Sequence, residues 1–268
     1  MTFDLWWLAY PLLGIVVGFL AGLLGIGGGG ILVPMLTALF LAQSFPREQV
    51  IHMALGTSMA TIVLTSVSSL RAHHSRGAVN CGIVWRITPG ILAGTFFGTF
   101  FASRLAAVPL AIFFACFISF VACQMWFGVK PKPSRELPRR VGMTAVGLFI
   151  GFISALVAIG GGSLSVPFML WCNVDARHAI GTSAAIGFPI ALAGTIGYLV
   201  NGWSNTGMPP YTLGYIHLPA LVLAGGASIL MAPIGASCAH RMPVDILRKI
   251  FAGILILLAL EMLTSVFR

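Results

Sequence analysis

Two glycine-rich segments of this chain contain the residue types that could bind a ligand. Residues 18–36 read GFLAGLLGIGGGGILVPML, and residues 151–170 read GFISALVAIGGGSLSVPFML. Consecutive glycines destabilise a helix and leave backbone N–H groups without intrahelical partners. Where a helix then begins, its free N–H groups and the positive end of its dipole favour an anion. The spacing therefore predicts an anion site made of backbone, and the sequence contains it twice.

Ten residues are the predicted contacts of this anion. They are three glycines from each segment and two hydroxyl residues from the Gly-Thr-Ser triplet that follows each segment: Gly27, Gly28, Gly29, Gly160, Gly161, Gly162, Thr57, Ser58, Thr182 and Ser183. Pro34 and Pro167 are expected in or just after the first turn of the next helix, where a missing N–H costs least. Two other interpretations stay open. The glycines could allow close helix packing, and the hydroxyls could bond to a carbonyl one turn earlier in their own helix.

Arg86, His52 and His178 are further candidates for contact with an anion or a proton. Arg86 lies just inside an apolar run, where its side chain could equally extend to the membrane surface. His52 and His178 each open the third run of a half and could carry a proton, or be ordinary helix-start residues. The six acidic residues lie near the ends of apolar runs or in loops, whereas a cation pathway normally needs acids within the membrane. We therefore expect anionic or neutral cargo, and no metal site or cofactor.

The composition places these residues in an integral membrane protein. Of the 268 residues, 58% are hydrophobic and 8% are charged, whereas soluble chains carry about 25% charged residues. The apolar runs lie at about 6–25, 31–44, 50–70, 83–103 and 107–128, and then at about 141–160, 164–174, 178–200, 214–238 and 246–266. Since a spanning helix needs roughly 20 apolar residues, the second run of each half is too short to cross. We expect an all-α fold with eight to ten membrane segments, in which each half is a broken-helix hairpin plus three spanning helices.

The charged residues predict how the halves are oriented. Residues 1–128 form the first repeat, residues 129–140 a basic linker, and residues 141–268 the second repeat. With the linker in the cytoplasm, twelve of the 15 Lys and Arg residues fall inside, and both termini fall on the outer side. The loop after the third run is basic in the first half and uncharged in the second. Equivalent loops then face opposite sides, which predicts inverted repeats related by a two-fold axis in the membrane plane.

Several other functions are excluded by the sequence. Residues 25–30 satisfy GxGxxG, but they lie between apolar helices rather than in the βαβ unit that a dinucleotide site requires. Residues 56–60 and 181–185 lack the last glycine of the GxSxG motif, so an intramembrane serine hydrolase is not supported. The net charge of +9 is spread over short loops and reflects topology rather than nucleic-acid binding. We expect that the chain is not an enzyme.

These motifs resemble those of the TauE/SafE family of sulfite exporters and related transporters of anionic, often organosulfur, compounds. The resemblance rests on GxGGGxxxVP in both halves, with Ala158 in place of the first glycine in the second copy, on the Gly-Thr-Ser triplets, and on the Arg-Leu and Arg-Met helix ends at Arg104 and Arg241. It covers nearly the whole chain. It implies a multi-pass transporter of the cell inner membrane that moves sulfite, sulfonates or sulfoacetate-like anions outward. Ser163 stands where Gly30 stands in the first half, so the two hairpins are not identical.

The sequence as a whole predicts a secondary transporter that holds a small anion between the two glycine-rich hairpins and works by alternating access. An anion-selective channel with the same inverted repeats is the alternative. The expected partners are the anionic substrate and the lipid membrane, with no nucleic acid, and a homo-oligomer stays open.

Overall fold

The apolar runs of the sequence form helices in the computed structural model, which describes residues 6–24, 28–128, 133–239 and 244–267. The first half contains α1 (Trp6–Leu24), α2 (Gly29–Ala42), α3 (Arg47–Ser75), α4 (Cys81–Arg104) and α5 (Ala107–Phe127). The second half contains α6 (Arg140–Val157), α7 (Gly162–Trp171), α8 (Ala176–Gly202), α9 (Leu218–Ala239) and α10 (Val244–Phe267).

The lengths and composition of these helices fit a membrane bundle. α3, α5, α6, α8 and the Leu218–Gly235 part of α9 are each long and apolar enough to cross a membrane. α2 and α7 have 14 and 10 residues. They would reach only about 21 and 15 Å, well short of a hydrocarbon core of about 30 Å. The prediction of an all-α integral membrane protein, with a short second helix in each half, is confirmed.

The start of α9 differs from the sequence expectation. The sequence predicts an apolar segment from residue 214, but residues 212–217 instead form a small antiparallel hairpin of β1 (Thr212–Leu213) and β2 (Ile216–His217). Gly214 lies in this turn with a φ of 56°, a left-handed conformation that glycine adopts without steric cost. The helix therefore begins only at Leu218.

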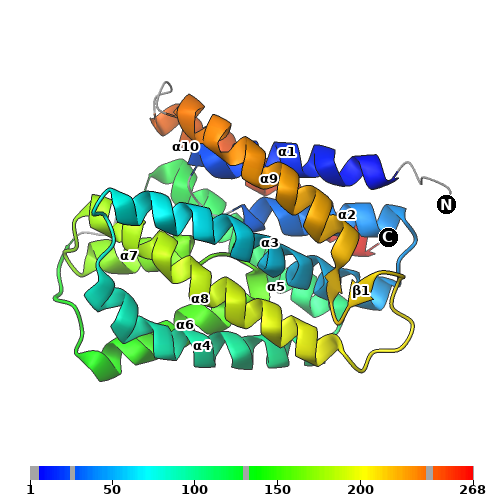
Figure 1. Ribbon diagram of the computed structural model, residues 1–268, viewed down its shortest axis with the longest axis horizontal. Coiled ribbons are helices and arrows are strands. Elements are labelled where there is room, and N and C mark those ends of the chain that lie inside the picture. Colours follow the sequence, from blue (N-terminus) through cyan, green and yellow to red (C-terminus); the bar gives the residue numbers. More distant parts are fainter. Residues whose placement is uncertain (1–5, 25–27, 129–132, 240–243, 268) are drawn as a thin grey trace.

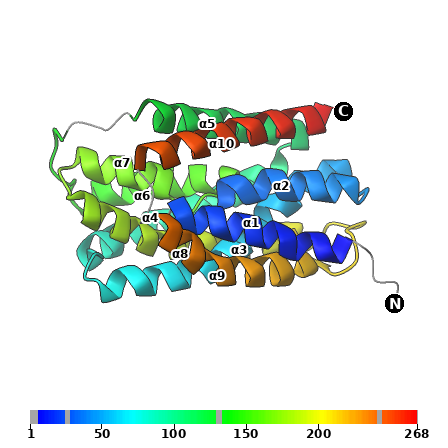
Figure 2. The same ribbon diagram turned by 90° about the horizontal axis from the view of Figure 1, so that it is seen from above.

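The helices lie roughly along one direction (Figure 1). α1 begins and α10 ends at one end of the bundle, whereas residues 133–139 lie at the opposite end (Figure 2). α3 and α8 pack against each other in antiparallel fashion near the centre. At the end of this pair, the Arg177 guanidinium near the start of α8 donates to the Arg76 carbonyl just after α3, at 2.6 Å.

The first helix of each half packs against the fourth helix of the other half. α1 lies on α9, and α6 lies on α4. Glycines allow both contacts, because a Cβ atom on Gly18 would collide with the backbone of Ser228, and a Cβ atom on Gly94 would collide with the backbone of Leu148. Small residues that let helix backbones approach are the usual way to pack helices within a membrane. The two halves are therefore interleaved rather than side by side.

Hydrogen bonds from the two Gly-Thr-Ser triplets connect the halves in an equivalent way. The Thr57 hydroxyl on α3 accepts a hydrogen bond from the N–H of His217, directly before α9, at 3.0 Å. The Thr182 hydroxyl on α8 accepts from the N–H of Asn80, which caps α4, at 2.9 Å. Both threonine side chains are fully buried. Each triplet thus holds the start of the fourth helix of the opposite half.

The glycine of each triplet provides the room for this contact. A Cβ atom on Gly56 would lie 2.7 Å from the carbonyl oxygen of Tyr215, and a Cβ atom on Gly181 would collide with the carbonyl oxygen of Ala78. The carbonyl concerned lies two residues before the bonded N–H in both halves. The order Gly-Thr therefore has a structural cause. Glycine leaves room for the opposing backbone segment, and threonine accepts a hydrogen bond from it.

We predict that Thr182→Val weakens the fold. Valine has nearly the shape of threonine but cannot accept the Asn80 N–H, and a partly buried donor without an acceptor costs roughly 1–3 kcal/mol. Equilibrium unfolding in mixed micelles should show this loss, and Thr57→Val should behave alike. Thr195→Val is the control, because the Thr195 hydroxyl bonds only to the Ala191 carbonyl of its own helix. Equal unfolding midpoints for the Thr182 and Thr195 variants would show that the contact does not stabilise the fold.

Candidate functional site

Each helix break contains a glycine in the left-handed conformation directly before the short helix. Gly28 precedes α2 with a φ of 67°, and Gly161 precedes α7 with a φ of 78°. Residues with a side chain adopt this conformation only at a cost of about 1–2 kcal/mol. The Gly28 carbonyl accepts from the N–H groups of Ile31 and Leu32, and the Gly161 carbonyl accepts from the corresponding pair in α7. The two breaks therefore share one backbone geometry, with each glycine as the N-cap of a short helix.

The prolines lie deeper in these helices than the sequence suggested. α2 begins at Gly29 and α7 at Gly162, which makes Pro34 and Pro167 the sixth residue of each helix. The sequence predicts both prolines in or just after the first turn, because it places the helix starts two residues later in the chain. That prediction is wrong. In the second turn, proline removes the N–H that would bond to the carbonyl four residues earlier. The carbonyls of Gly30 and Ser163 lack that donor as a result.

The two breaks are in direct contact near the middle of the bundle. A Cβ atom on Gly29 would collide with the carbonyl oxygen of Ala158, which ends α6. Ile62 of α3 lies beside both breaks, since its Cδ1 and Cγ2 atoms are 2.9 and 3.6 Å from where Cβ atoms of Gly29 and Gly160 would be. On the other side, Gly187 of α8 packs on the backbone of Gly160. α3 and α8 thus enclose the crossing of the two breaks.

The predicted site glycines differ in why they must be glycine. Gly28 and Gly161 are required by their conformation, and Gly29 by its contact with Ala158. A Cβ atom on Gly160 or Gly162 would have no neighbour closer than 3.6 Å, so packing does not demand glycine there. Gly27 lies outside the described residues. Close packing therefore accounts for only part of the glycine run, and Gly160 and Gly162 have backbone beside the break with room for a methyl group.

The four predicted hydroxyls also divide into two kinds. Thr57 and Thr182 bind backbone of the opposite half rather than a carbonyl of their own helix. Ser183 accepts a hydrogen bond from the Ser165 hydroxyl at 2.8 Å, and its Oγ lies 3.6 Å from where a Cβ atom of Gly162 would be. Ser58 is fully buried, and its hydroxyl has no partner among the described residues. Both threonine hydroxyls are therefore engaged with backbone of the opposite half, whereas the Ser58 hydroxyl is not engaged by the described residues and that of Ser183 lies beside the start of α7.

Arg86 is not brought to the breaks. It is exposed in the second turn of α4, and its carbonyl lies near the Thr144 hydroxyl in the second turn of α6. The break that follows α6 begins at Ala158, about 21 Å further along that helix. The position at the end of the bundle suits a side chain that extends to the membrane surface.

His52 and His178 both lie early in the third helix of their half, but in different surroundings. His52 is buried, with its Nε2 atom 3.0 Å from the Ala102 carbonyl and its ring stacked on Tyr215. His178 is exposed, and its Nδ1 atom lies 3.4 Å from a carboxylate oxygen of Asp175. The imidazole of His178 therefore faces a loop acid at the bundle end, whereas that of His52 is enclosed by protein.

A third histidine, which the sequence did not single out, is also buried. His217 lies among the rings of Tyr10, Phe40 and Phe45, at centroid distances of 5.7, 5.4 and 5.3 Å. Burial lowers its pKa to about 4, so the imidazole is neutral near pH 7 and adds no positive charge. Helices α1 and α2 and the loop after α2 build this enclosure around the hairpin of β1 and β2. No local motif marks it in the sequence.

Neutral groups provide the polarity of the interior. Besides the tyrosines, the buried polar side chains among the described residues are those of threonine, serine and histidine: Thr37, His52, Thr57, Ser58, Thr61, Ser66, Thr95, Thr99, Ser154, Ser165, Thr182, Ser183, His217 and Ser228. The acids whose side chains are described, Glu48, Glu136, Asp175 and Glu261, are exposed. An anion at the breaks would therefore meet amide and hydroxyl donors rather than a fixed cation.

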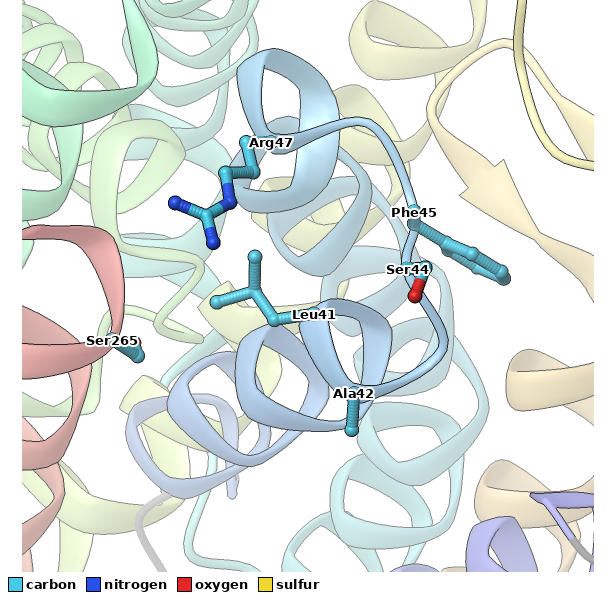
Figure 3. A pocket seen from close by; sticks show the side chains of 6 residues that line it. All are labelled: Leu41, Ala42, Ser44, Phe45, Arg47 and Ser265. Carbon is cyan, nitrogen blue, oxygen red and sulfur yellow. The ribbon is translucent and has the colours of Figure 1, made fainter. Parts of the chain in front are cut away.

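One cavity lies well away from the breaks. A hollow of about 520 Å³ opens where α2 ends and α10 ends (Figure 3). It is lined by Leu41, Ala42, Ser44, Phe45, Arg47 and Ser265. The 14-residue length of α2 separates this hollow from Gly28 by about 20 Å. It belongs to the bundle end rather than to the helix breaks.

Comparison with known proteins agrees with this architecture. A family model described as sulfite exporter TauE/SafE matches residues 10–262. A probable membrane transporter protein of Haemophilus influenzae is 37% identical, over 94% of this chain and 96% of its own length. The probable membrane transporter protein YdhB of Bacillus subtilis is 30% identical, over 89% of this chain and 91% of its own. A probable membrane transporter protein of Methanocaldococcus jannaschii is 27% identical, over 96% of both chains.

No solved structure matches the chain. The family match and the relatives nevertheless extend along almost the whole sequence, and they describe transport rather than catalysis. Helices long enough to cross a membrane, interrupted by two glycine breaks, fit that description. The chain therefore belongs to the sulfite exporter TauE/SafE family of membrane transporters.

Proposed function

We propose that the chain is a secondary transporter that exports small anions, such as sulfite, sulfonates or sulfoacetate-like compounds, across the inner membrane. The observation that carries this proposal is that the start of α2 meets the break between α6 and α7 at one enclosed crossing. Each start offers amide donors and partial positive charge to an anion. The family description, which names sulfite, supports the choice of cargo.

The geometry favours a carrier over an anion-selective channel. Gly29 and Ala158 touch across the crossing, and the Ile62 side chain of α3 lies against Gly29. An open channel would need these backbones to separate, whereas a carrier needs such a barrier in each of its closed states. Alternating access then consists of one half rocking against the other around the cargo.

Two features support inverted repeats within this proposal. α2 ends near the start of α1, where Gln43 bonds to Tyr10, and α7 ends beside residues 133–139, where the Trp171 carbonyl accepts from Ser134. Those two places are opposite ends of the bundle (Figure 2). Half-helices that leave a common crossing in opposite directions are what a two-fold axis in the membrane plane would produce. The matched exchange of α1 on α9 and α6 on α4 agrees with that axis.

Basic residues support a cytoplasmic position for the end that holds residues 133–139. The described arginines near that end are Arg71, Arg76, Arg86, Arg135, Arg139, Arg140 and Arg177, whereas Arg47 and Arg104 lie near the other end. Cytoplasmic segments carry the excess of Lys and Arg in membrane proteins. Both chain termini would then face the outer side.

This orientation predicts how single cysteines react. In a cysteine-free background, Ser204→Cys, in the exposed loop after α8, should react with a membrane-impermeant maleimide added to spheroplasts. Ser134→Cys, exposed at the opposite end, should react only after the membrane is opened. Labelling of intact spheroplasts at residue 134 and not at residue 204 would reverse the proposed orientation.

The open backbone at Gly162 predicts a selective loss of transport. Gly162→Ala places a methyl group between the first amides of α7 and the Ser183 hydroxyl without a steric clash. We expect uptake of labelled sulfite into proteoliposomes to fall roughly tenfold, because added bulk in a fitted site costs about that much, while thermal stability stays unchanged.

Gly253→Ala is the matched control for this experiment. Gly253 lies in α10 with open space around it, so the same substitution there should leave uptake and stability as in the wild type. Wild-type uptake by Gly162→Ala would argue against a site at the start of α7. Saturable uptake with counterflow would distinguish the proposed carrier from a channel.

A further inference from the structure

The start of α7 carries hydroxyl groups where the start of α2 carries none. In the register that aligns Gly28 with Gly161, Ser163 stands opposite Gly30, and Ser165 stands opposite Leu32. The first break instead faces apolar side chains, since the nearest atoms to a Cβ on Gly30 would belong to Ile118 and Leu255. The two breaks therefore share a backbone geometry but differ in the side chains around it.

Three serine hydroxyls near the breaks have hydrogen-bonding capacity that the protein does not use. The Oγ atoms of Ser163 and Ser58 are shielded from solvent and have no partner among the described residues. Ser183 accepts from Ser165, but its own proton has no acceptor in the described part of the chain. A buried hydroxyl without a partner costs free energy, so each of these groups requires an explanation.

These hydroxyls belong to the helices that border the breaks. Ser163 belongs to the first turn of α7, and Ser183 projects to within 3.6 Å of where a Cβ of Gly162 would be. Ser58 lies one turn before Ile62 on α3, and Ile62 touches both breaks. Residues four apart share one face of a helix. Ser183 therefore lies beside the start of α7, and Ser163 and Ser58 belong to two further helices that border the crossing.

Backbone donors complete this group. The N–H groups of Gly162 and Ser163 open the ten-residue helix α7 and donate to no carbonyl in the described part of the chain. Together with the serines they form a set of neutral donors without a carboxylate among the buried side chains described. Several neutral donors around one helix start suit a ligand with several charged oxygens, because each oxygen can accept more than one hydrogen bond.

We infer that the oxyanion head of the cargo, a sulfite or sulfonate group, is held at the second break by the Gly162 and Ser163 amides and by the hydroxyls of Ser163, Ser183 and Ser58. This assignment rests on the proposed function, and it makes the two breaks unequal. The first break, with Gly30 among apolar side chains, closes over the site and contributes little affinity. Ser165 positions Ser183 and does not touch the cargo.

The variants Ser163→Ala and Ser58→Ala test this inference. The measurement is the initial rate of transport into proteoliposomes as a function of substrate concentration. Neither substitution breaks a hydrogen bond within the protein, so thermal stability should equal or exceed that of the wild type. The apparent KM for sulfite and for methanesulfonate should rise at least about tenfold, the usual loss when a hydrogen bond to a charged ligand is removed. If the alanine variant at residue 163 does not fold, Ser163→Gly, which copies the first half, replaces it.

Thr95→Val is the matched control. The Thr95 hydroxyl is also buried and has no partner among the residues that the structure describes, but it faces Gly151 in the contact between α4 and α6. Its removal should leave the KM unchanged. Gly30→Ser, which adds a hydroxyl at the equivalent place in the first break, should not lower the KM when combined with Ser163→Gly.

The outcomes separate the inference from the proposed function. Unchanged KM values for both serine variants, in protein that transports sulfite, would overturn the assignment and leave the proposed function standing. A KM that rises equally in Thr95→Val would also overturn it, because the effect would then be general. Wild-type proteoliposomes that transport neither sulfite nor methanesulfonate would overturn the proposed function itself.

Discussion

A helix that stops inside a membrane must place its unpaired backbone groups against protein, because lipid offers them no hydrogen bonds. The contact of Gly29 with Ala158 meets this constraint by setting one break against the other. α3 and α8 then enclose the pair. The rest of the bundle shields this crossing from lipid and leaves its hydrogen-bond donors free on the inside.

The same constraint explains why the halves are interleaved. If each half packed only on itself, the unpaired amides of its break would not be enclosed by the other half. Instead, Thr57 and Thr182 hold the start of α9 and α4 in the opposite half. A displacement of α4 or α9 must therefore move α8 or α3, which line the crossing. The packing that encloses the breaks therefore also couples their movement to that of the outer helices.

The sequence allowed most of the fold to be predicted, because hydropathy and glycine runs are local signals. The helices and both breaks follow from them. The role of Thr57 could not be predicted, since its partner His217 is 160 residues away. The prolines were misplaced because the helices extend back into the glycines themselves. Of the candidate site, the repeat showed the contrast between Ser163 and Gly30, whereas the contact of Ser165 with Ser183 joins two helices and could not be predicted from it.

The choice of neutral donors over a cation has a consequence for a carrier. After release of its cargo, a carrier must return through the same occluded state with an empty site. A buried arginine would then be left without its anion, and an uncompensated charge away from water costs several kcal/mol. Serine hydroxyls and helix-start amides carry only partial charges, so the empty site is less costly to enclose. Weak, distributed donors therefore suit a site that must release an anion as readily as it binds one.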